Sequence, residues 1–296
     1  MTEDLRSVQH RLKKNRNLKR ILSHENLPIL PEILSKLEMA LRDPQVDSAR
    51  VAHIIENEPV IAGRLLKVAN SALYGGRQKI TDLQMAVSRI GLNTIRHMVY
   101  SLVLPHLFID IHMVDHRLFW KHSLATANIC RKLAMENQKD GHFGEVAYMA
   151  GLVHDVGVLL LALGMTEEYT EIIQTAYSEG RPLDEVEYEA WGLTHSDVGA
   201  IFVRETWELD ERIAEALLMF ERAPDLSPRD PLADVLYVAD NLCIAAGLTN
   251  GALGDPKLQY PDPLKRLGEM GYSEGTIEAL LKIIRDLAGA LEGFLT

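Results

Sequence analysis

The sequence predicts an all-α fold. Apolar residues recur at helical spacing in one stripe after another, and no stretch shows the strict alternation of a half-buried strand. Prolines, glycines and capping aspartates separate the stripes, as they do at the ends of helices. With 296 residues, 47% of them hydrophobic and 25% charged, the chain can form a well-packed core in one large domain or two ordinary ones.

Residues 1–24 form a polar segment ahead of the first strong apolar stripe. The segment carries seven basic residues and a weak helical stripe that ends at Ile21. It is either a basic interaction arm or a solvated lead-in helix or linker, and we interpret it as the lead-in because charge runs usually lie in solvent. No apolar segment follows Met1, so no secretory signal is expected.

Residues 25–108 are predicted to form an N-terminal helical lobe. Asp47 offers an N-cap to its second helix, and Pro59 begins the third. We expect the glycines at 75 and 76 to end that third helix. A single long helix is then expected over residues 83–102.

Residues 109–250 are predicted to form a second helical lobe, followed by a C-terminal loop and helix over 251–296. A glycine-rich break at 141–144 precedes a run so apolar that it should be a buried helix. A loop is expected at 224–231, and a glycine- and proline-rich stretch continues to Pro263. The other expected helices are 116–136, 167–179, 183–190, one from Thr194 with the spacing of a capping box, one from Asp210, 231–247 and 275–295.

His154 and Asp155 interrupt the most apolar run of the chain. Buried polar groups are costly unless they are paired, hydrogen-bonded or bound to a metal. Neutral imidazole and ionised carboxylate are both good ligands for divalent transition metals. The two residues are therefore either a polar pair of the core or part of a metal site.

Two further polar residues lie on apolar helices, His122 in Trp120-Lys121-His122-Ser123 and Asp240 in Val238-Ala239-Asp240-Asn241. Together with His154 and Asp155 they give the order His, His-Asp, Asp. This order resembles the HD superfamily of metal-dependent phosphohydrolases. The resemblance implies an all-α fold in which these four residues hold a divalent metal and align a water on a phosphate.

Three stretches narrow the resemblance to the HDOD domain, an HD-related output domain of bacterial signalling proteins: Leu27-Pro28-Ile29-Leu30-Pro31, Ala69-Asn70-Ser71-Ala72-Leu73-Tyr74-Gly75 and Ala86-Val87-Ser88-Arg89-Ile90-Gly91-Leu92. The resemblance runs from about residue 22 to about residue 250. It implies bacterial signal output through a partner protein in a signalling pathway. Members are commonly joined to receiver or other sensory domains, and none is expected within this sequence.

The related HD-GYP phosphodiesterases, which degrade cyclic di-GMP, add further histidines and a Gly-Tyr-Pro loop. Thr194-His195 resembles the first added histidine. No histidine pair occurs near Met219-Phe220-Glu221, and Ala223-Pro224-Asp225-Leu226 stands where the loop is expected. A two-metal site of that kind lacks ligands, so cyclic di-GMP hydrolysis is not expected.

The resemblance makes His122, His154, Asp155 and Asp240 the metal ligands. His195 is a further ligand, a donor that supports a ligand, or an exposed residue of a helix start. Two imidazoles and two carboxylates leave room for water on one octahedral iron, manganese or nickel ion, while zinc prefers fewer ligands.

Two functions remain open. One is a non-enzymatic signalling module that binds a partner protein or a ligand, and the other is a metal-dependent phosphohydrolase that acts on a nucleotide or a phosphate ester. The complete metal set favours the enzyme. Two observations favour the module: the histidine pair is missing, and the run Val158–Leu163 is wholly apolar where HD enzymes often carry basic residues. We therefore prefer the signalling module.

Composition limits the partners and the compartment. The net charge of −11 argues against broad binding to nucleic acid or to an anionic membrane. The longest uncharged apolar run, Val156–Met165, is about half of the ~20 residues that a membrane helix needs. Cys130 and Cys243 lie far apart without a CxxC motif, which indicates reduced thiols in a cytoplasmic protein. No feature specifies an oligomeric state.

Overall fold

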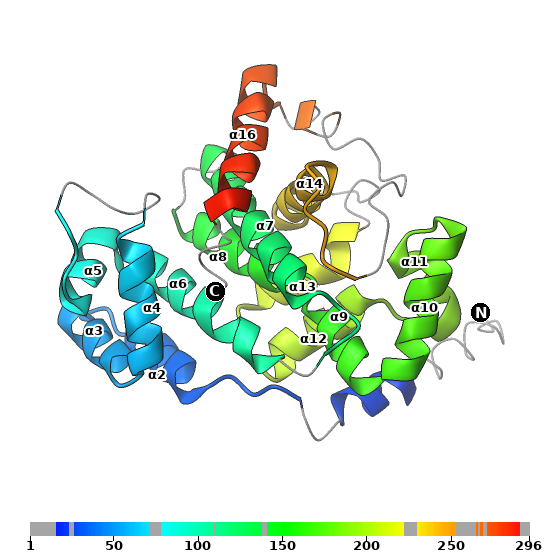
Figure 1. Cartoon of the computed structure of the whole chain (residues 1–296), viewed down its shortest axis with the longest axis horizontal. Coiled ribbons are helices and arrows are strands. Elements are labelled where there is room, and N and C mark those ends of the chain that lie inside the picture. The colour runs from blue at the N-terminus through cyan, green and yellow to red at the C-terminus, as the bar shows by residue number, and fades with distance from the viewer. Residues whose placement is uncertain are drawn as a thin grey trace, which may run out of the picture. The chain divides into compact units, whose positions relative to one another are not determined.

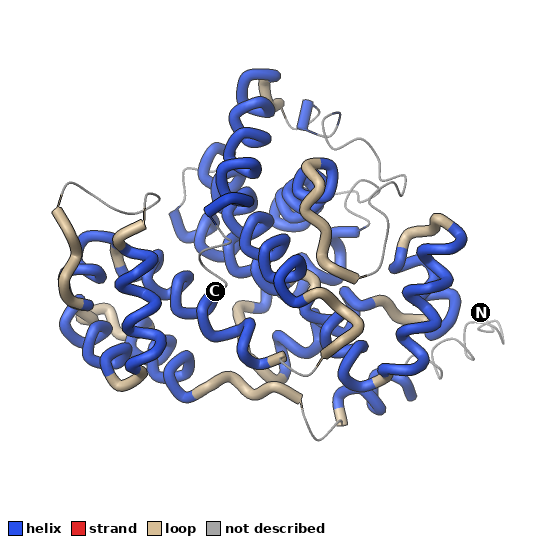
Figure 2. Tube along the Cα trace, in the orientation of Figure 1, coloured by secondary structure: helices blue, strands red, loops and turns tan. Residues whose placement is uncertain are grey.

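The computed structural model describes residues 16–23, 27–71, 78–108, 111–137, 141–221, 230–252, 265, 267–268 and 271–290. These residues form helices and loops and contain no strand (Figure 2). The predicted all-α fold is therefore confirmed. The chain divides into two compact units, one of Pro28–Ile109 with Ala290–Thr296 and one of Met1–Leu27 with Asp110–Gly289. The four-segment division with borders at residues 24, 108 and 250 stays a prediction.

The smaller unit, called the N-lobe below, consists of α2 (Glu32–Leu41), α3 (Ser48–Glu56), α4 (Pro59–Ala69), α5 (Leu83–Ile90), α6 (Leu92–Val103) and the 3-10 helix η1 (Leu104–Leu107) (Figure 1). Helices α3 and α6 each pack on α2, α4 and α5. Their apolar faces fully bury Leu34, Ile55, Leu65 and Ile95. Removing these side chains from water is the main favourable contribution to the fold of this unit.

Local signals set the starts of the N-lobe helices, as the sequence predicts. The Asp47 carboxylate accepts a hydrogen bond of 2.8 Å from the backbone N–H of Arg50. The Asp82 carboxylate accepts one of 2.7 Å from the backbone N–H of Met85. Pro59 is the first residue of α4, where its missing N–H costs no hydrogen bond.

Two helix ends of the N-lobe differ from the prediction. Helix α4 ends before Asn70, whose side chain donates to the carbonyl oxygens of Leu66 and Ile80 and accepts from the Ile80 N–H. Asn70 therefore ends the helix, and the glycines at 75 and 76 lie outside the described residues. The helix expected over 83–102 is broken into α5 and α6 at Gly91, because its φ of 94° is not helical.

The larger unit, called the HD-like lobe below, consists of α7 (His116–Asn137), α8 (Gly141–Val153), α9 (Val156–Gly164), α10 (Thr166–Glu179), α11 (Leu183–Trp191), α12 (His195–Glu205), α13 (Glu211–Met219), α14 (Pro231–Ala245) and most of α16 (Glu274–Ala290) (Figure 1). Helix α7 packs on α8 and α14, and α12 packs on α9 and α13. Helix α13 also contacts α8 and α14, so these six helices surround one core.

Some loops expected in the HD-like lobe cannot be compared with the structure, and one is helical. Residues 141–144, expected to break the chain, form the first turn of α8. The predicted loop at 224–231 and the stretch from 251 to 263 fall mostly outside the described residues. Glycine disfavours a helix by only about 1 kcal/mol, which the packing of α8 on α7 offsets.

Residues 16–23 are the part of the polar N-terminal segment that the structure describes, and they do not form a solvated lead-in. Residues 16–22 are helical, and Ile21 is fully buried. Arg20 forms an ion pair of 2.7 Å with Glu168 on α10. Ile21, the last member of the weak apolar stripe, thus anchors this helix to the HD-like lobe, while residues 1–15 lie outside the described residues.

One stretch, Gly141–Gly164, is long and apolar enough to cross a membrane when judged by length and composition alone. In the structure 94% of its apolar window is buried. This is weak evidence for a membrane span, since the core helices of soluble proteins pass the same test. A soluble protein is consistent with this burial.

Candidate metal centre

Helix α7 carries His122 into the interior of the HD-like lobe, where its side chain is 1% exposed. Its Nδ1 lies 2.9 Å from the carbonyl oxygen of Leu248, which follows α14. A carbonyl oxygen only accepts hydrogen bonds, so Nδ1 carries the proton and donates it. In the neutral ring, Nε2 therefore presents a lone pair to the surrounding pocket.

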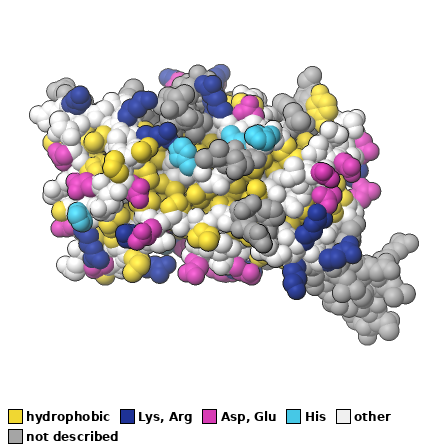
Figure 3. All heavy atoms as spheres, turned by 60° about the horizontal axis from the view of Figure 1, so that its bottom comes forward, with side chains coloured by type: hydrophobic (Ala, Val, Ile, Leu, Met, Phe, Trp, Pro, Cys, Tyr) yellow, Lys and Arg dark blue, Asp and Glu magenta, His cyan; other side chains and the backbone are white. Residues whose placement is uncertain are grey.

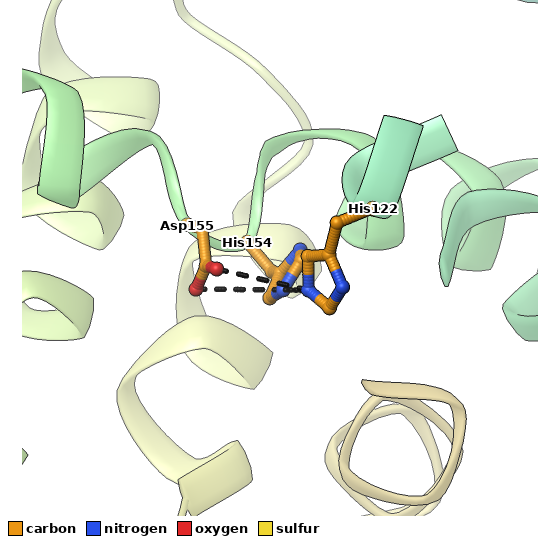
Figure 4. A group of neighbouring side chains, drawn as sticks. All are labelled: His122, His154 and Asp155. Atoms are coloured by element: carbon orange, nitrogen blue, oxygen red, sulfur yellow. Dashed lines mark hydrogen bonds and ion pairs between the residues drawn. The ribbon is translucent and has the colours of Figure 1, made fainter. Parts of the chain in front are cut away.

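His154 and Asp155 lie at the junction of α8 and α9, not within one continuous buried helix as predicted. Consecutive residues of an α-helix project about 100° apart, so an unbroken helix would not point both side chains into one pocket. The break turns both toward His122 (Figure 4). His154 Nδ1 donates to the Gly151 carbonyl oxygen over 2.9 Å, and the Asn250 side chain donates to Asp155 Oδ2 over 2.8 Å.

Asp240, on α14, joins these three residues. Its Oδ1 lies 3.0 Å from Nε2 of His122 and 3.5 Å from Nε2 of His154. The two Nε2 atoms are 3.2 Å apart, and the Asp155 carboxylate lies 3.4 Å from His154 and 3.8 Å from His122. The structure thus brings together all four ligand candidates from three parts of the chain, and we call them the quartet.

The quartet places electron-pair donors against one another. With both rings neutral, two Nε2 lone pairs face each other and a carboxylate oxygen, which is unfavourable unless a cation lies among them. Ligands about 2.1 Å from an ion lie roughly 3.0–3.4 Å from their neighbours in octahedral or tetrahedral geometry. Three of the distances around His122 and His154, those of 3.0, 3.2 and 3.4 Å, fall in that range, and the other two, 3.5 and 3.8 Å, are slightly longer. The residues therefore fit a divalent ion such as iron, manganese or nickel.

Electrostatics within the quartet also favour a cation. Burial lowers the pKa of His154, but the Asp155 and Asp240 carboxylates outweigh it and raise the pKa to about 9. Burial raises the pKa of Asp240, but the hydrogen bonds of His122 and His154 outweigh it and hold the pKa well below its usual range. Protons and a divalent ion therefore compete for this pocket.

His195 lies next to the quartet and is 6% exposed, so its interpretation as an exposed residue is wrong. The predicted capping box is present at Thr194 and fixes the start of α12. His195 Nε2 lies 3.7 Å from Asp155 Oδ1 and 3.0 Å from Glu221 Oε1. Its Nδ1 lies 2.8 Å from Glu187 Oε2. The ring therefore neighbours the quartet through Asp155 and is not one of its members.

Sequence reasoning missed Glu187, Glu221 and Asn250. Glu187 is fully buried on the inward face of α11, and a carboxylate among the apolar positions of an amphipathic helix is the signal that could have found it. Glu221 and Asn250 follow the ends of helices, where no periodic pattern marks an inward direction.

Asp184, in the first turn of α11, lies close enough to Glu221 for that carboxylate to raise its pKa, so the pH dependence of stability can test this arrangement. Burial and the Glu221 carboxylate raise its pKa from 3.8 to about 7. Because the folded-state pKa is the higher one, the protonated form contributes stability that is complete below 3.8 and lost as the pH rises through about 7.

Between pH 5 and pH 8, we therefore expect the free energy of unfolding to fall less in metal-free Asp184→Asn than in the metal-free wild type. The expected difference is on the order of 1 kcal/mol, since the partial exposure of Asp184 reduces the effect. Urea unfolding at the two pH values measures this difference. Equal losses in the two proteins would contradict it.

Comparison with known proteins shows which family matches this sequence and which solved structures have a similar fold. The family model for the HDOD domain matches residues 27–222. An uncharacterized protein of Treponema pallidum (strain Nichols) is 20% identical over 200 residues, which are 68% of this chain and 38% of that protein. The chain thus spans less than two fifths of the length of this curated relative.

Three solved structures share the fold. An HDOD domain protein with unknown function from Geobacter sulfurreducens is 23% identical, with a TM-score of 0.72 and coverage of 95% of this chain and 96% of that chain. A protein from Marinobacter aquaeolei VT8, provisionally named a signal transduction protein, is 20% identical, with a TM-score of 0.73 and coverage of 97% and 66%. A protein from Shewanella amazonensis SB2B, provisionally named a metal-dependent phosphohydrolase, is 21% identical, with a TM-score of 0.63 and coverage of 94% and 99%.

Proposed function

This chain belongs to the HDOD domain family, and from that membership we propose that it is a non-enzymatic regulatory module of bacterial signal transduction. In this proposal the quartet holds a divalent ion inside the HD-like lobe. The ion stabilises the lobe, and the surface of the protein binds a partner protein or a ligand of the signalling pathway.

Burial of the quartet is the observation that carries this proposal. The side chains of His122 and His154 are 1% and 0% exposed, and those of Asp155 and Asp240 are 6% and 11% exposed. A catalytic metal keeps an open position for water or substrate, whereas a closed site contributes its binding energy to folding. The burial of all four ligands therefore supports a structural or regulatory ion.

The charge around the pocket also supports a module. Within the described residues, the ion pairs of Asp155, Asp240, Glu187 and Glu221 are all formed with histidines. Enzymes that transfer phosphoryl groups use arginine, lysine or metal ions to neutralise developing charge. A phosphate ester that entered this pocket would meet carboxylates without an arginine or lysine partner.

Metal analysis tests the proposal directly. We expect the purified protein, after loading with Mn²⁺ and extensive dialysis, to retain manganese at the quartet. Plasma mass spectrometry gives the content, and an anomalous difference map gives the position. Protein that retains no manganese, or a peak away from the quartet, would overturn the proposal.

A metal-dependent phosphohydrolase is the second candidate, favoured by the completeness of the quartet. A bound divalent ion supplies Lewis-acid activation of water near neutral pH. The four side chains would hold the ion, and the carbonyl oxygens of Leu248 and Gly151 keep both Nε2 atoms turned toward it. The burial of the quartet and the absence of a described basic partner weigh against this candidate.

Cyclic di-GMP hydrolysis is expected to be absent, because Phe220 and Glu221 occupy the region of the histidine pair that this reaction uses. The Phe220 ring lies against His154, with ring centroids 5.9 Å apart. Incubation with manganese or iron, followed by chromatography, should recover cyclic di-GMP intact. Turnover that His154→Ala abolishes would contradict this prediction.

We further propose a cytoplasmic protein that binds neither nucleic acid nor membrane. Acidic and basic side chains are interspersed on the face drawn in Figure 3, without a broad basic region. Cys130 and Cys243 are both buried free thiols. Thiol titration of denatured protein made in the cytosol should therefore detect two free thiols for each chain, whereas a Cys130–Cys243 disulfide would exclude the reduced state.

A further inference from the structure

The short segment Gly247–Ala252, which continues the chain beyond α14, bonds to two members of the quartet, and we call it the strap. Its Leu248 carbonyl oxygen accepts a hydrogen bond of 2.9 Å from Nδ1 of His122. Its Asn250 side chain donates a hydrogen bond of 2.8 Å to Oδ2 of Asp155. One non-helical segment thus fastens a ligand on α7 and a ligand at the α8–α9 junction.

The backbone of the strap fixes the orientation of the Asn250 amide. Its Oδ1 accepts a hydrogen bond of 3.3 Å from the Ala252 N–H. An N–H only donates, so the amide oxygen faces Ala252 and the NH₂ group faces Asp155. The other oxygen of Asp155, Oδ1, lies 3.4 Å from Nε2 of His154 and faces the quartet. Asn250 therefore holds the outer oxygen of a carboxylate ligand, a contact that orients the ligand toward its ion.

Both ends of the strap are attached to helices. At the first end, the Leu248 N–H donates to the Cys243 carbonyl oxygen over 2.9 Å, which closes the last turn of α14. At the other end, the Asp115 N–H donates to the Gly251 carbonyl oxygen over 3.1 Å. Gly251 has a φ of 71°, and a Cβ atom there would lie 2.5 Å from the Asp115 carbonyl oxygen. The strap thus lies against the residue that precedes α7, at a contact that only glycine fits.

The strap lies between the buried quartet and the solvent. Leu248, Thr249 and Asn250 are half-buried, whereas the quartet side chains are at most 11% exposed. An ion therefore cannot reach the quartet unless part of the lobe moves. Segments that open locally are those with few buried contacts and exposed backbone. Lifting the strap breaks its hydrogen bonds to His122, Asp155 and Asp115 but leaves the packing of the helices around the quartet in place.

We propose that the strap is the gate of the metal pocket, and that Asn250 is the positioning residue that keeps the gate closed by holding Asp155 toward the ion. The proposal rests on the quartet binding a divalent ion, as proposed above. Because the strap bonds to two of the ligands, the ion and the closed strap stabilise each other, and this coupling is reciprocal. Occupancy of the buried pocket thus changes the mobility of a segment at the surface.

The rate of manganese release tests the role of Asn250. Protein loaded with Mn²⁺ is mixed with excess EDTA, desalted after timed intervals and analysed by plasma mass spectrometry. We expect Asn250→Ala to release its ion about 10- to 100-fold faster than the wild type, the usual effect of removing a group that supports a metal ligand. Thr249→Ala is the matched control within the strap, because it leaves the hydrogen bonds of Leu248 and Asn250 in place, and it should release the ion at the wild-type rate.

The metal-free melting temperature distinguishes positioning from packing. Asn250→Ala removes the hydrogen bond to Asp155, so the metal-free variant should melt within about 5 °C of the metal-free wild type. Release that is faster only in step with a much larger loss of metal-free stability would overturn the positioning role. Release at the wild-type rate would overturn the gate and leave the quartet site standing. Wild-type protein that retains no manganese would overturn both proposals.

Hydrogen exchange of wild-type protein provides a second test that needs no variant. A peptide that covers residues 248–252 should exchange its amide hydrogens at least several-fold more slowly in manganese-loaded protein than in metal-free protein. A peptide from α3, in the N-lobe, should exchange equally in both. Equal exchange of the strap peptide in protein that retains manganese would overturn the coupling between the ion and the strap.

Discussion

Gly157→Ala is expected to lower the melting temperature by roughly 6–12 °C, which corresponds to a loss of about 3 kcal/mol in the free energy of unfolding. A Cβ atom at position 157 would overlap the carbonyl oxygen of His195 and lie 2.6 Å from its carbonyl carbon. It would also lie 2.9 Å from the backbone nitrogen of Gly199. Backbone atoms cannot move aside as a side chain can, so α9 and α12 must separate.

The same separation should move His195 away from Asp155, because Gly157 follows Asp155 by two residues and α12 begins at His195. Thermal unfolding followed by circular dichroism measures the change. Gly63→Ala is the matched control, since Gly63 lies within α4 and a Cβ atom added there would meet no other atom within 4 Å. The control should be neutral or more stable by about 0.4–1 kcal/mol. An unchanged melting temperature for Gly157→Ala would refute the close approach of α9 and α12.

The starts of helices could be read from the sequence because their signals are local. Asp47, Asp82 and Thr194 each place an oxygen acceptor within three residues of the N–H group that it satisfies. The break at Gly91 could not be read in this way. The apolar stripe continues on both sides of it, and a glycine within a helix differs from a glycine that ends one only in its φ angle.

The candidate site was predictable to the extent that its residues stand out on apolar helices. His122, His154, Asp155 and Asp240 are polar residues in apolar runs, and the structure brings each of the two histidines within 4 Å of both aspartates. The break between α8 and α9 was not predictable, because the apolar run continues on both sides of it. Glu221 and Asn250 reach the site through tertiary packing, which spacing along the chain does not encode.

His122→Ala is expected to remove one bound ion for each chain and, with it, the stabilisation that the ion provides. An ion present at 100 times its dissociation constant stabilises the folded state by about 2.7 kcal/mol, or roughly 5–10 °C in melting temperature. We expect Mn²⁺ to raise the melting temperature of chelator-treated wild-type protein by about this amount. The same addition should raise that of His122→Ala by much less, because the quartet then lacks the imidazole that lies 3.0 Å from Asp240.

Comparing the melting temperatures of metal-free and metal-loaded protein separates the loss of a metal ligand from the loss of packing. Loss of the buried His122 ring also removes its hydrogen bond to Leu248, which lowers the melting temperature equally with and without metal. Only the difference between the two states reports ion binding. His53→Ala is the control, since the His53 side chain is 80% exposed on α3, and it should keep both the ion and the full shift. A shift of wild-type size in His122→Ala, together with an unchanged metal content, would exclude His122 as a ligand.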